Sequence, residues 1–443
     1  KGENIWDRYT HDHPYFILDG QNGDIACDSY HHYKTDMTLM KHLDVDFYRF
    51  SLSWSRILPT GFAYQVNPDG IRYYNDVINH CIENDVIPIV TMFHWDTPQP
   101  LQDLGGFANE LMVDWFEDYA RVVYENFGDR VKMWLTFNEP RQICYEGVGN
   151  NDKAPGSNSS GIGDYLCSHN LIKAHARAYH LYDKEFRHKQ HGKVSITIDG
   201  ENTWPATNST ADKEAAERIM AFTFGWYTDP IYHPNGDYPE VMKKFVAERS
   251  KKEGFKKSRL PEFTKEEVEY IKGTYDFFGL NHYTTVEVAD IPDPPIGGKP
   301  SLFTDARATV GYNPSWPSTS APWLKIVPWG FTSVLKWIKD RYGDVPIYVT
   351  ENGYADNTEK LDDQGRIDFH TQYLSALLDA IYDHQVNVKA YTVWSLFDNF
   401  EWRDGFVTRF GLYDVDYDHP DRIRTPKASS EFFKKVIATR RIV

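Results

Sequence analysis

The chain has 443 residues, of which 41% are hydrophobic and 15% aromatic, a composition that supports a large buried core. Asp and Glu outnumber Lys and Arg by 64 to 48, which gives a formal charge of −16 at pH 7. This charge argues against nucleic acids and anionic membranes and favours a neutral or cationic partner, and no apolar run is long enough to cross a bilayer.

Seven short apolar runs alternate with longer stretches of helical periodicity. Residues 71–85 form the first clear helical stretch, with its apolar side chains on one face, and residues 115–128 form another that ends at Gly128. Alternation of this kind predicts parallel βα units. The predicted strands are residues 45–54, 86–95, 131–139, 193–199, 275–283, 346–352 and 388–398.

Polar residues gather at the C-terminal ends of several predicted strands, where barrel enzymes collect their catalytic groups. No glycine-rich phosphate loop follows the first of these strands, which disfavours an open dinucleotide-binding sheet. We therefore expect an α/β fold, a (β/α)8 TIM barrel, with residues 1–443 as a single catalytic domain. Residues 286–323 are rich in Pro, Gly and Ser and are predicted to form a long loop over the barrel mouth. The strand-end residues are Arg49, His94, Trp95, Asn138, Glu139, Asn281, Tyr283, Glu351 and Trp394.

Two glutamates end apolar runs in the same way, Glu139 in TFNEP and Glu351 in YVTENG. A barrel would bring them to one cleft, because both stand at the same end of their strands. Glycosidic bond cleavage needs such a pair: one carboxyl protonates the leaving oxygen, and the other meets the oxocarbenium-like carbon in its ionised form. Arg49 and Tyr283 are candidates to keep Glu351 ionised, and Asn138 to bind a sugar hydroxyl. Two loop glutamates without a shared role are the alternative.

A third acid strengthens the case for a sugar site. The stretch WSLFDNFEWRDGF begins with Trp394 at the end of the last predicted strand and places Glu401 and Trp402 in the loop that follows. A carboxyl beside tryptophans suits a pair of sugar hydroxyls held under a stacking ring. An aromatic loop that simply packs into the core is the alternative.

Six motifs resemble those of the family 1 glycoside hydrolases, the β-glucosidase family of TIM barrels, and the resemblance extends over nearly the whole chain. The motifs occur in the family's order, and their wording is most similar to insect β-glucosidases and myrosinases. Together they are highly specific, whereas each alone would be weak. The motifs are YRFSLSW, FHWDTPQ, TFNEP, GLNHY, YVTENG and TVWSLFDNFEW.

The resemblance implies a retaining mechanism with Glu351 as nucleophile and Glu139 as acid/base, and it implies no metal and no cofactor. It also implies that Arg49, Asn281 and Tyr283 support the nucleophile. The 6-phospho members of the family lack the carboxylate of NFEW, so its presence here implies an unphosphorylated sugar. The positions that match the binding site of the non-reducing sugar are His94, Trp95, Asn138, Trp394, Glu401 and Trp402.

The front of the sequence departs from the family pattern. Family members begin with a strand that ends in a sugar-binding Gln, and this sequence starts after it, at KGENIWD. We therefore expect the first barrel strand to be absent here. The barrel should then show a gap between the strands predicted at 388–398 and 45–54, with an unpaired edge on each side.

The remaining motifs are weak. His31 and His32 are adjacent but form no metal motif by themselves. Sequons at residues 158–160 and 208–210 lie in polar stretches and favour a secreted glycoprotein over a cytoplasmic protein. The cysteines show no CxxC spacing and are interpreted as small buried residues, with a disulfide between some pair left open. They are Cys27, Cys81, Cys144 and Cys167.

The leading hypothesis is a retaining, exo-acting β-glycosidase that hydrolyses unphosphorylated β-D-glucosides, with β-galactosides and β-fucosides left open. Its partner would be a small glycoside or an oligosaccharide, and a homodimer is left open. An insect-type myrosinase is the first alternative, in which Arg141 would face a substrate sulfate; a solvated loop arginine is the favoured interpretation of that residue. A catalytically silent glycan-binding relative is the second alternative, although such proteins usually lose one of the two carboxylates.

Overall fold

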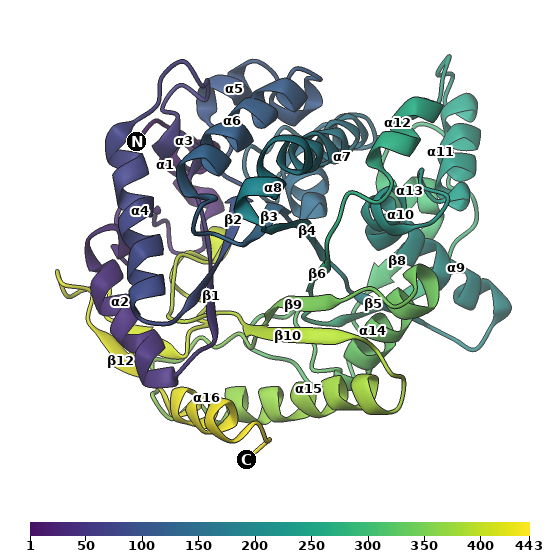
Figure 1. The fold of residues 1–443 in the computed structure, drawn as a ribbon. Helices are drawn as coiled ribbons and strands as arrows, with labels where there is room; N and C mark the ends of the chain where they lie inside the picture. Colours follow the sequence, from purple (N-terminus) through teal and green to yellow (C-terminus); the bar gives the residue numbers. More distant parts are fainter.

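Seven parallel strands form the central sheet of the computed structural model, which describes residues 1–443 (Figure 1). They pair in the order β1-β2-β3-β4-β6-β9-β10, which makes a nearly closed (β/α)8-type barrel, and all seven predicted strands are confirmed. Strands β2, β3 and β4 are buried along almost their whole length, so they read as continuous apolar runs. The bounds are β1 (Phe47–Ser51), β2 (Ile87–Phe93), β3 (Met133–Asn138), β4 (Lys193–Asp199), β6 (Phe278–Asn281), β9 (Ile347–Asn352) and β10 (Val388–Val393).

Helices surround this sheet (Figure 1). The helix predicted at 71–85 is α4, which begins earlier because the Asn67 side chain caps it by accepting a hydrogen bond from the amide of Asp69 and because Pro68 suits its first position. The long helices are α2 (Ser29–Leu43), α4 (Pro68–Glu83), α6 (Met112–Phe127), α7 (Gly163–Leu181), α11 (Glu240–Lys252), α14 (Pro328–Tyr342), α15 (Gln364–Tyr382) and α16 (Ala428–Thr439). Shorter helices are α1 (Ile5–Asp12), α3 (Trp54–Ile57), α5 (Gln99–Asp103), α8 (Arg187–Gln190), α9 (Thr210–Met220), α10 (Trp226–Tyr232), α12 (Lys265–Ile271) and α13 (Leu302–Ala306).

The barrel is open between β1 and β10, as expected. These strands are the two ends of the sheet and do not pair with each other, so each leaves one edge without a strand partner. A cavity of about 1440 Å³ lies along the two edges. It extends to Arg49, His94, Trp394 and Trp402, so the gap and the carboxyl ends of the strands share one continuous space.

A second, three-stranded sheet corrects the prediction of a long loop over residues 286–323. Strand β7 (Thr285–Asp290) pairs in parallel with β5 (Asn202–Pro205) and antiparallel with β8 (Ala308–Gly311). The loop prediction was wrong here because it rested on Pro, Gly and Ser content, whereas the buried side chains of Val286 and Val288 pack into the core. A short ribbon of β11 (Tyr413–Val415) and β12 (Arg424–Pro426) completes the strands.

The cysteines divide into two kinds. Cys144 and Cys167 form a disulfide that joins the π-helical segment η3 (Gln142–Gly149) to α7. Cys27 and Cys81 are buried free thiols, as the sequence interpretation expected for all four.

The remaining weak motifs lie at the surface or in ordinary contacts. His31 and His32 both face the carboxylate of Asp28, and the structure holds no cluster of three or more residues placed to bind a metal ion. The sequon residues Asn158 and Asn208 are exposed. None of the helices combines the length and the apolarity that a bilayer crossing needs.

Candidate active site

Arg49 joins the two glutamate-bearing strand ends at the mouth of the barrel. Its Nη1 donates to Oε1 of Glu351 at 2.7 Å, and its Nη2 donates to Oδ1 of Asn138, the neighbour of Glu139, at 2.6 Å. The guanidinium is itself fixed by Thr91 Oγ1 at 3.1 Å and by the carbonyl of Thr350 at 3.2 Å. Arg49, from β1, thus connects the ends of β3 and β9, which are far apart in the sequence.

Glu351 occupies an environment that favours an ionised carboxylate. It accepts the hydrogen bond from Arg49 on one oxygen and a second from the Tyr283 hydroxyl, at 2.7 Å, on the other. Only 5% of each side chain of the Arg49–Glu351 pair is exposed, so water screens the pair weakly. Burial and the charges of Glu351 and Glu139 raise the pKa of Tyr283 well above its ordinary value, which keeps the phenol a donor.

Glu139 lies in the opposite environment. Burial raises the pKa of its carboxyl well above the ordinary value, and the nearby carboxylates of Glu351 and Asp199 raise it further. The backbone of Glu139 has a left-handed φ of +51°, and the Glu139 amide donates to the carbonyl of Thr197 at 2.9 Å. Non-glycine residues held in this conformation cluster at functional sites. The structure therefore places a carboxyl whose surroundings favour its protonated form opposite one whose oxygens accept hydrogen bonds from Arg49 and Tyr283.

The side chain of Asn281 contacts Glu139 rather than the carboxylate of Glu351. The sequence resemblance implied support of Glu351, but the side-chain amide donates to Oε1 of Glu139 at 2.6 Å and to Oδ1 of Asn138 at 3.1 Å. Asn281 pairs with Glu351 in the ladder between β6 and β9, yet its side chain extends across the barrel end toward Glu139, which follows β3.

His94 and the tryptophans form an aromatic enclosure beside the carboxyls. The ring of Trp402 lies 4.4 Å from Trp95 and 6.0 Å from His94, and Trp394 lies 5.9 Å from His94, measured between centroids. Burial and the charge of Arg49 lower the pKa of His94 well below its ordinary value, so its Nε2 accepts from the Asn138 amide at 3.1 Å. Flat rings and a neutral imidazole suit the faces and hydroxyls of a sugar.

Glu401 lies in the same enclosure, next to Trp402. Burial raises its pKa to about 8, with a further contribution from the carboxylate of Asp404. A carboxyl poised near neutrality both donates and accepts hydrogen bonds, as a pair of sugar hydroxyls requires.

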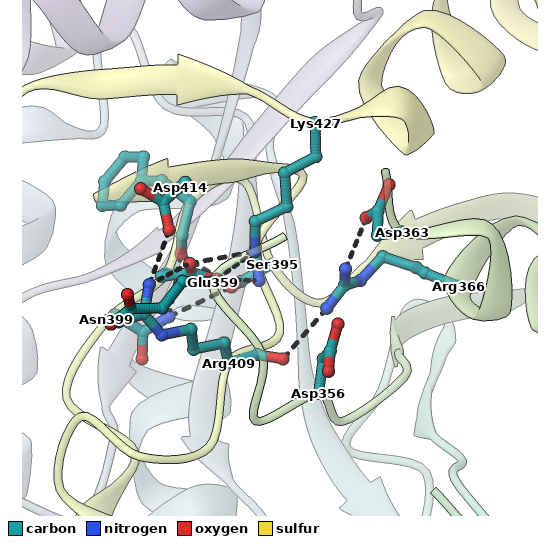
Figure 2. Close-up of polar contacts among 12 residues, drawn as sticks. Asp356, Glu359, Asp363, Arg366, Ser395, Asn399, Arg409, Asp414 and Lys427 are labelled. Carbon is teal, nitrogen blue, oxygen red and sulfur yellow. Dashed lines mark hydrogen bonds and ion pairs between the residues drawn. The ribbon is translucent and has the colours of Figure 1, made fainter. Parts of the chain in front are cut away.

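A buried ionic network, absent from the sequence predictions, anchors the segment between Trp394 and Glu401. Figure 2 shows the polar contacts around Lys427, Arg409 and Arg366. In this network Lys427 Nζ donates to both carboxylate oxygens of Asp398, at 2.8 and 2.9 Å. No local pattern could have revealed the pair, because Lys427 precedes α16 and Asp398 follows β10.

Arg141 is neither a solvated loop residue nor a free cation. Only 11% of its side chain is exposed, and its guanidinium pairs with Asp199 at 2.6 Å and with Glu201 at 3.3 Å. Asp199 was also missed, although the run KVSITID ends in it as the other strands end in their polar residues.

Comparisons with known proteins agree with this geometry. The family model for glycosyl hydrolase family 1 matches residues 1–442. The chain is 47% identical to Myrosinase 1 of Brevicoryne brassicae, over 99% of this chain and 93% of the relative. It is 42% identical to the human cytosolic beta-glucosidase, over 99% and 92%. Among solved structures, an aphid myrosinase superposes with a TM-score of 0.94 at 47% identity, covering 99% of this chain and 94% of that one. A rice beta-glucosidase superposes with a TM-score of 0.92 at 37% identity, covering 98% and 93%.

Proposed function

The chain belongs to glycosyl hydrolase family 1 and is an O-glycoside hydrolase of the β-glucosidase type, and from this we propose that it is a retaining, exo-acting hydrolase of unphosphorylated β-D-glucosides. We assign Glu351 as the nucleophile and Glu139 as the acid/base, within one catalytic domain. The observation that carries the assignment is the difference between their environments. Glu351 accepts hydrogen bonds from Arg49 and Tyr283, whereas burial and neighbouring carboxylates favour the protonated form of Glu139.

The proposed reaction has two steps. Glu351 attacks the anomeric carbon while the glycosidic C–O bond breaks, and Glu139 transfers its proton to the departing oxygen. Glu139, now a carboxylate, then takes a proton from water, whose oxygen attacks the same carbon and releases Glu351. Two inversions at one carbon give overall retention.

The remaining site residues hold the sugar or position the carboxyls in this proposal. Asn281, by its contact with Glu139, orients the acid/base, while Arg49 and Tyr283 support the nucleophile. Glu401 has the carboxylate of Asp404 beside it, which makes the pocket a poor place for a sugar phosphate. The sugar-binding residues are His94, Trp95, Asn138, Trp394, Glu401 and Trp402.

A mechanism-based label tests the nucleophile. Treatment with a 2-deoxy-2-fluoro-β-glucoside should attach the sugar to Glu351, as peptide mass spectrometry would show, and Glu351→Gln should abolish both labelling and turnover of aryl glucosides. Glu359→Gln, an exposed glutamate eight residues away, is the matched control and should label normally. Recovery of the label on another residue would overturn the assignment.

A thioglucosidase is the second candidate, because both Myrosinase 1 and the aphid myrosinase structure are 47% identical to this chain. The paired state of Arg141 counts against the sulfate contact considered for it. Parallel assays of a glucosinolate and an aryl O-glucoside separate the two activities. The third hypothesis, a silent glycan binder, is disfavoured by the two carboxylates with complementary environments.

A further inference from the structure

Three acidic side chains surround Arg141 at the outer side of Glu139, and we call this set the Arg141 cluster: Arg141, Glu146, Asp199 and Glu201. Arg141 lies two residues after Glu139, Asp199 ends β4, and Glu146 lies in η3. The guanidinium approaches Asp199 at 2.6 Å, Glu201 at 3.3 Å and Glu146 at 4.0 Å. Three carboxyls thus share one arginine, so acidic groups outnumber basic groups within the cluster, while burial raises the pKa of Glu146 and of Glu201.

The position of the cluster relative to Glu139 identifies which part of a substrate meets it. The acid/base delivers its proton to the leaving oxygen, so groups beside Glu139 and away from the His94–Trp402 enclosure face the leaving group. The carboxylate of Asp199 is close enough to Glu139 to raise its pKa. The cluster therefore borders the space of the aglycone rather than that of the sugar.

Aromatic side chains complete this border. Trp323 is 37% exposed, and its ring lies 5.9 Å from Tyr283, the donor to Glu351. Burial raises the pKa of Tyr312 and the carboxylates of Glu201 and Glu146 raise it further, so this phenol lies near the cluster. Rings next to carboxylates are the combination that receives organic cations and apolar groups with donor substituents.

The second observation is an unpaired acceptor inside the cluster. Oδ1 of Asp199 is buried and has no hydrogen-bond partner, while its Oδ2 accepts from Arg141 and from Gln142. A buried acceptor without a partner is unfavourable, and a ligand that donates to it removes that cost. Lys153 is the nearby cation: its ammonium lies over the ring of Trp95, and its charge also acts on the carboxyl of Glu146, so it offsets part of the negative charge of the cluster.

We propose that the Arg141 cluster makes the enzyme select glucosides whose aglycone carries a cationic or hydrogen-bond-donating group, and reject anionic aglycones. This inference rests on the proposed function for the identity of the leaving-group side, and it concerns the charge preference alone. A charge near partly buried carboxylates changes binding strongly at low ionic strength and less in salt.

Three aryl glucosides test the proposal. They differ only in the group at the para position of the aglycone, which is trimethylammoniomethyl, hydroxymethyl or carboxymethyl. We expect kcat/KM at low salt to fall in that order, by about tenfold or more from cation to anion. The double variant Glu146→Gln/Glu201→Gln should bring the cation-to-anion ratio toward one. Glu240→Gln removes a highly exposed charge from α11 and should leave the ratio unchanged.

A binding arm separates this inference from the proposed function. The β-C-glucosides of the same three aglycones cannot be hydrolysed, so calorimetry measures their Kd without any turnover. The same order of affinity, weakened in the double variant, supports the proposal even if no O-glucoside is cleaved. Equal affinities, tighter binding of the anion, no binding of any of the three, or an unchanged ratio in the double variant would overturn it.

Discussion

Replacing Lys427 with methionine should destabilise the protein and weaken sugar binding together. The ammonium of Lys427 lies 2.8 and 2.9 Å from the two oxygens of Asp398, and these side chains are 2% and 0% exposed. Methionine keeps much of the volume but removes the charge. Asp398 would then be a buried carboxylate without its counterion, in the segment that carries Trp394 and Glu401.

The expected magnitude follows from what remains around Asp398. Breaking a buried ion pair by removing one partner typically costs about 3–5 kcal/mol. Asp398 keeps a hydrogen bond from the amide of Gly411 at 2.8 Å and has Arg409 Nη1 at 3.7 Å. We therefore expect the lower end, about 3 kcal/mol, which corresponds to a Tm about 3 °C lower for an entropy of unfolding that scales with 443 residues.

Thermal melts and glucoside kinetics form the assay. Lys427→Met should lower Tm and raise KM for an aryl glucoside. Lys435 is an exposed lysine on α16, so Lys435→Met should change the free energy of unfolding by no more than about 0.5 kcal/mol and should leave KM unchanged. The double variant Lys427→Met/Asp398→Leu removes both charges and should recover part of the lost Tm. A Lys427→Met variant as stable as Lys435→Met, or a double variant no more stable than Lys427→Met, would refute the reasoning.

Two further predictions concern Glu139. Glu139→Ala should slow glucosides with poor leaving groups far more than dinitrophenyl glucosides, which depart without a proton, and azide should partly restore the second class; an equal loss for both classes without azide rescue would contradict the acid/base role. Asp199→Asn removes a carboxylate that raises the pKa of Glu139, so that pKa should fall and the alkaline limb of the kcat/KM pH profile should move to lower pH. A limb that stays in place or moves upward would show that Asp199 does not act on Glu139.

The strands and their polar ends could be predicted from the sequence because both are local. An apolar run of strand length, stopped by a polar residue, predicts a strand buried on both faces with a functional end, and all seven strands were found this way. The positions of Glu139 and Glu351 followed from the same rule. The sequence resemblance added the family, which the family model supports over residues 1–442.

Contacts between distant segments could not be predicted, because each depends on where the barrel places a side chain relative to its neighbours. Proline and glycine content suggested a loop where β7 and β8 pair with each other. Composition describes one segment, whereas strand pairing depends on two segments, so composition could not reveal the pairing. The disulfide of Cys144 and Cys167 depends likewise on the approach of η3 to α7.

The same limit applies inside the site. The residue types of Asn281 and Arg141 were visible in the sequence, but the partner of each was not, and the partner decides what the residue does. The Asn281 side chain donates to Glu139 although its strand pairs with the strand of Glu351, and Arg141 is paired because Asp199, at the end of β4, lies 2.6 Å from it. Local chemistry therefore indicated the two carboxyls that we propose as catalytic, whereas the charge of the space around them was decided only when the barrel brought separate strand ends together.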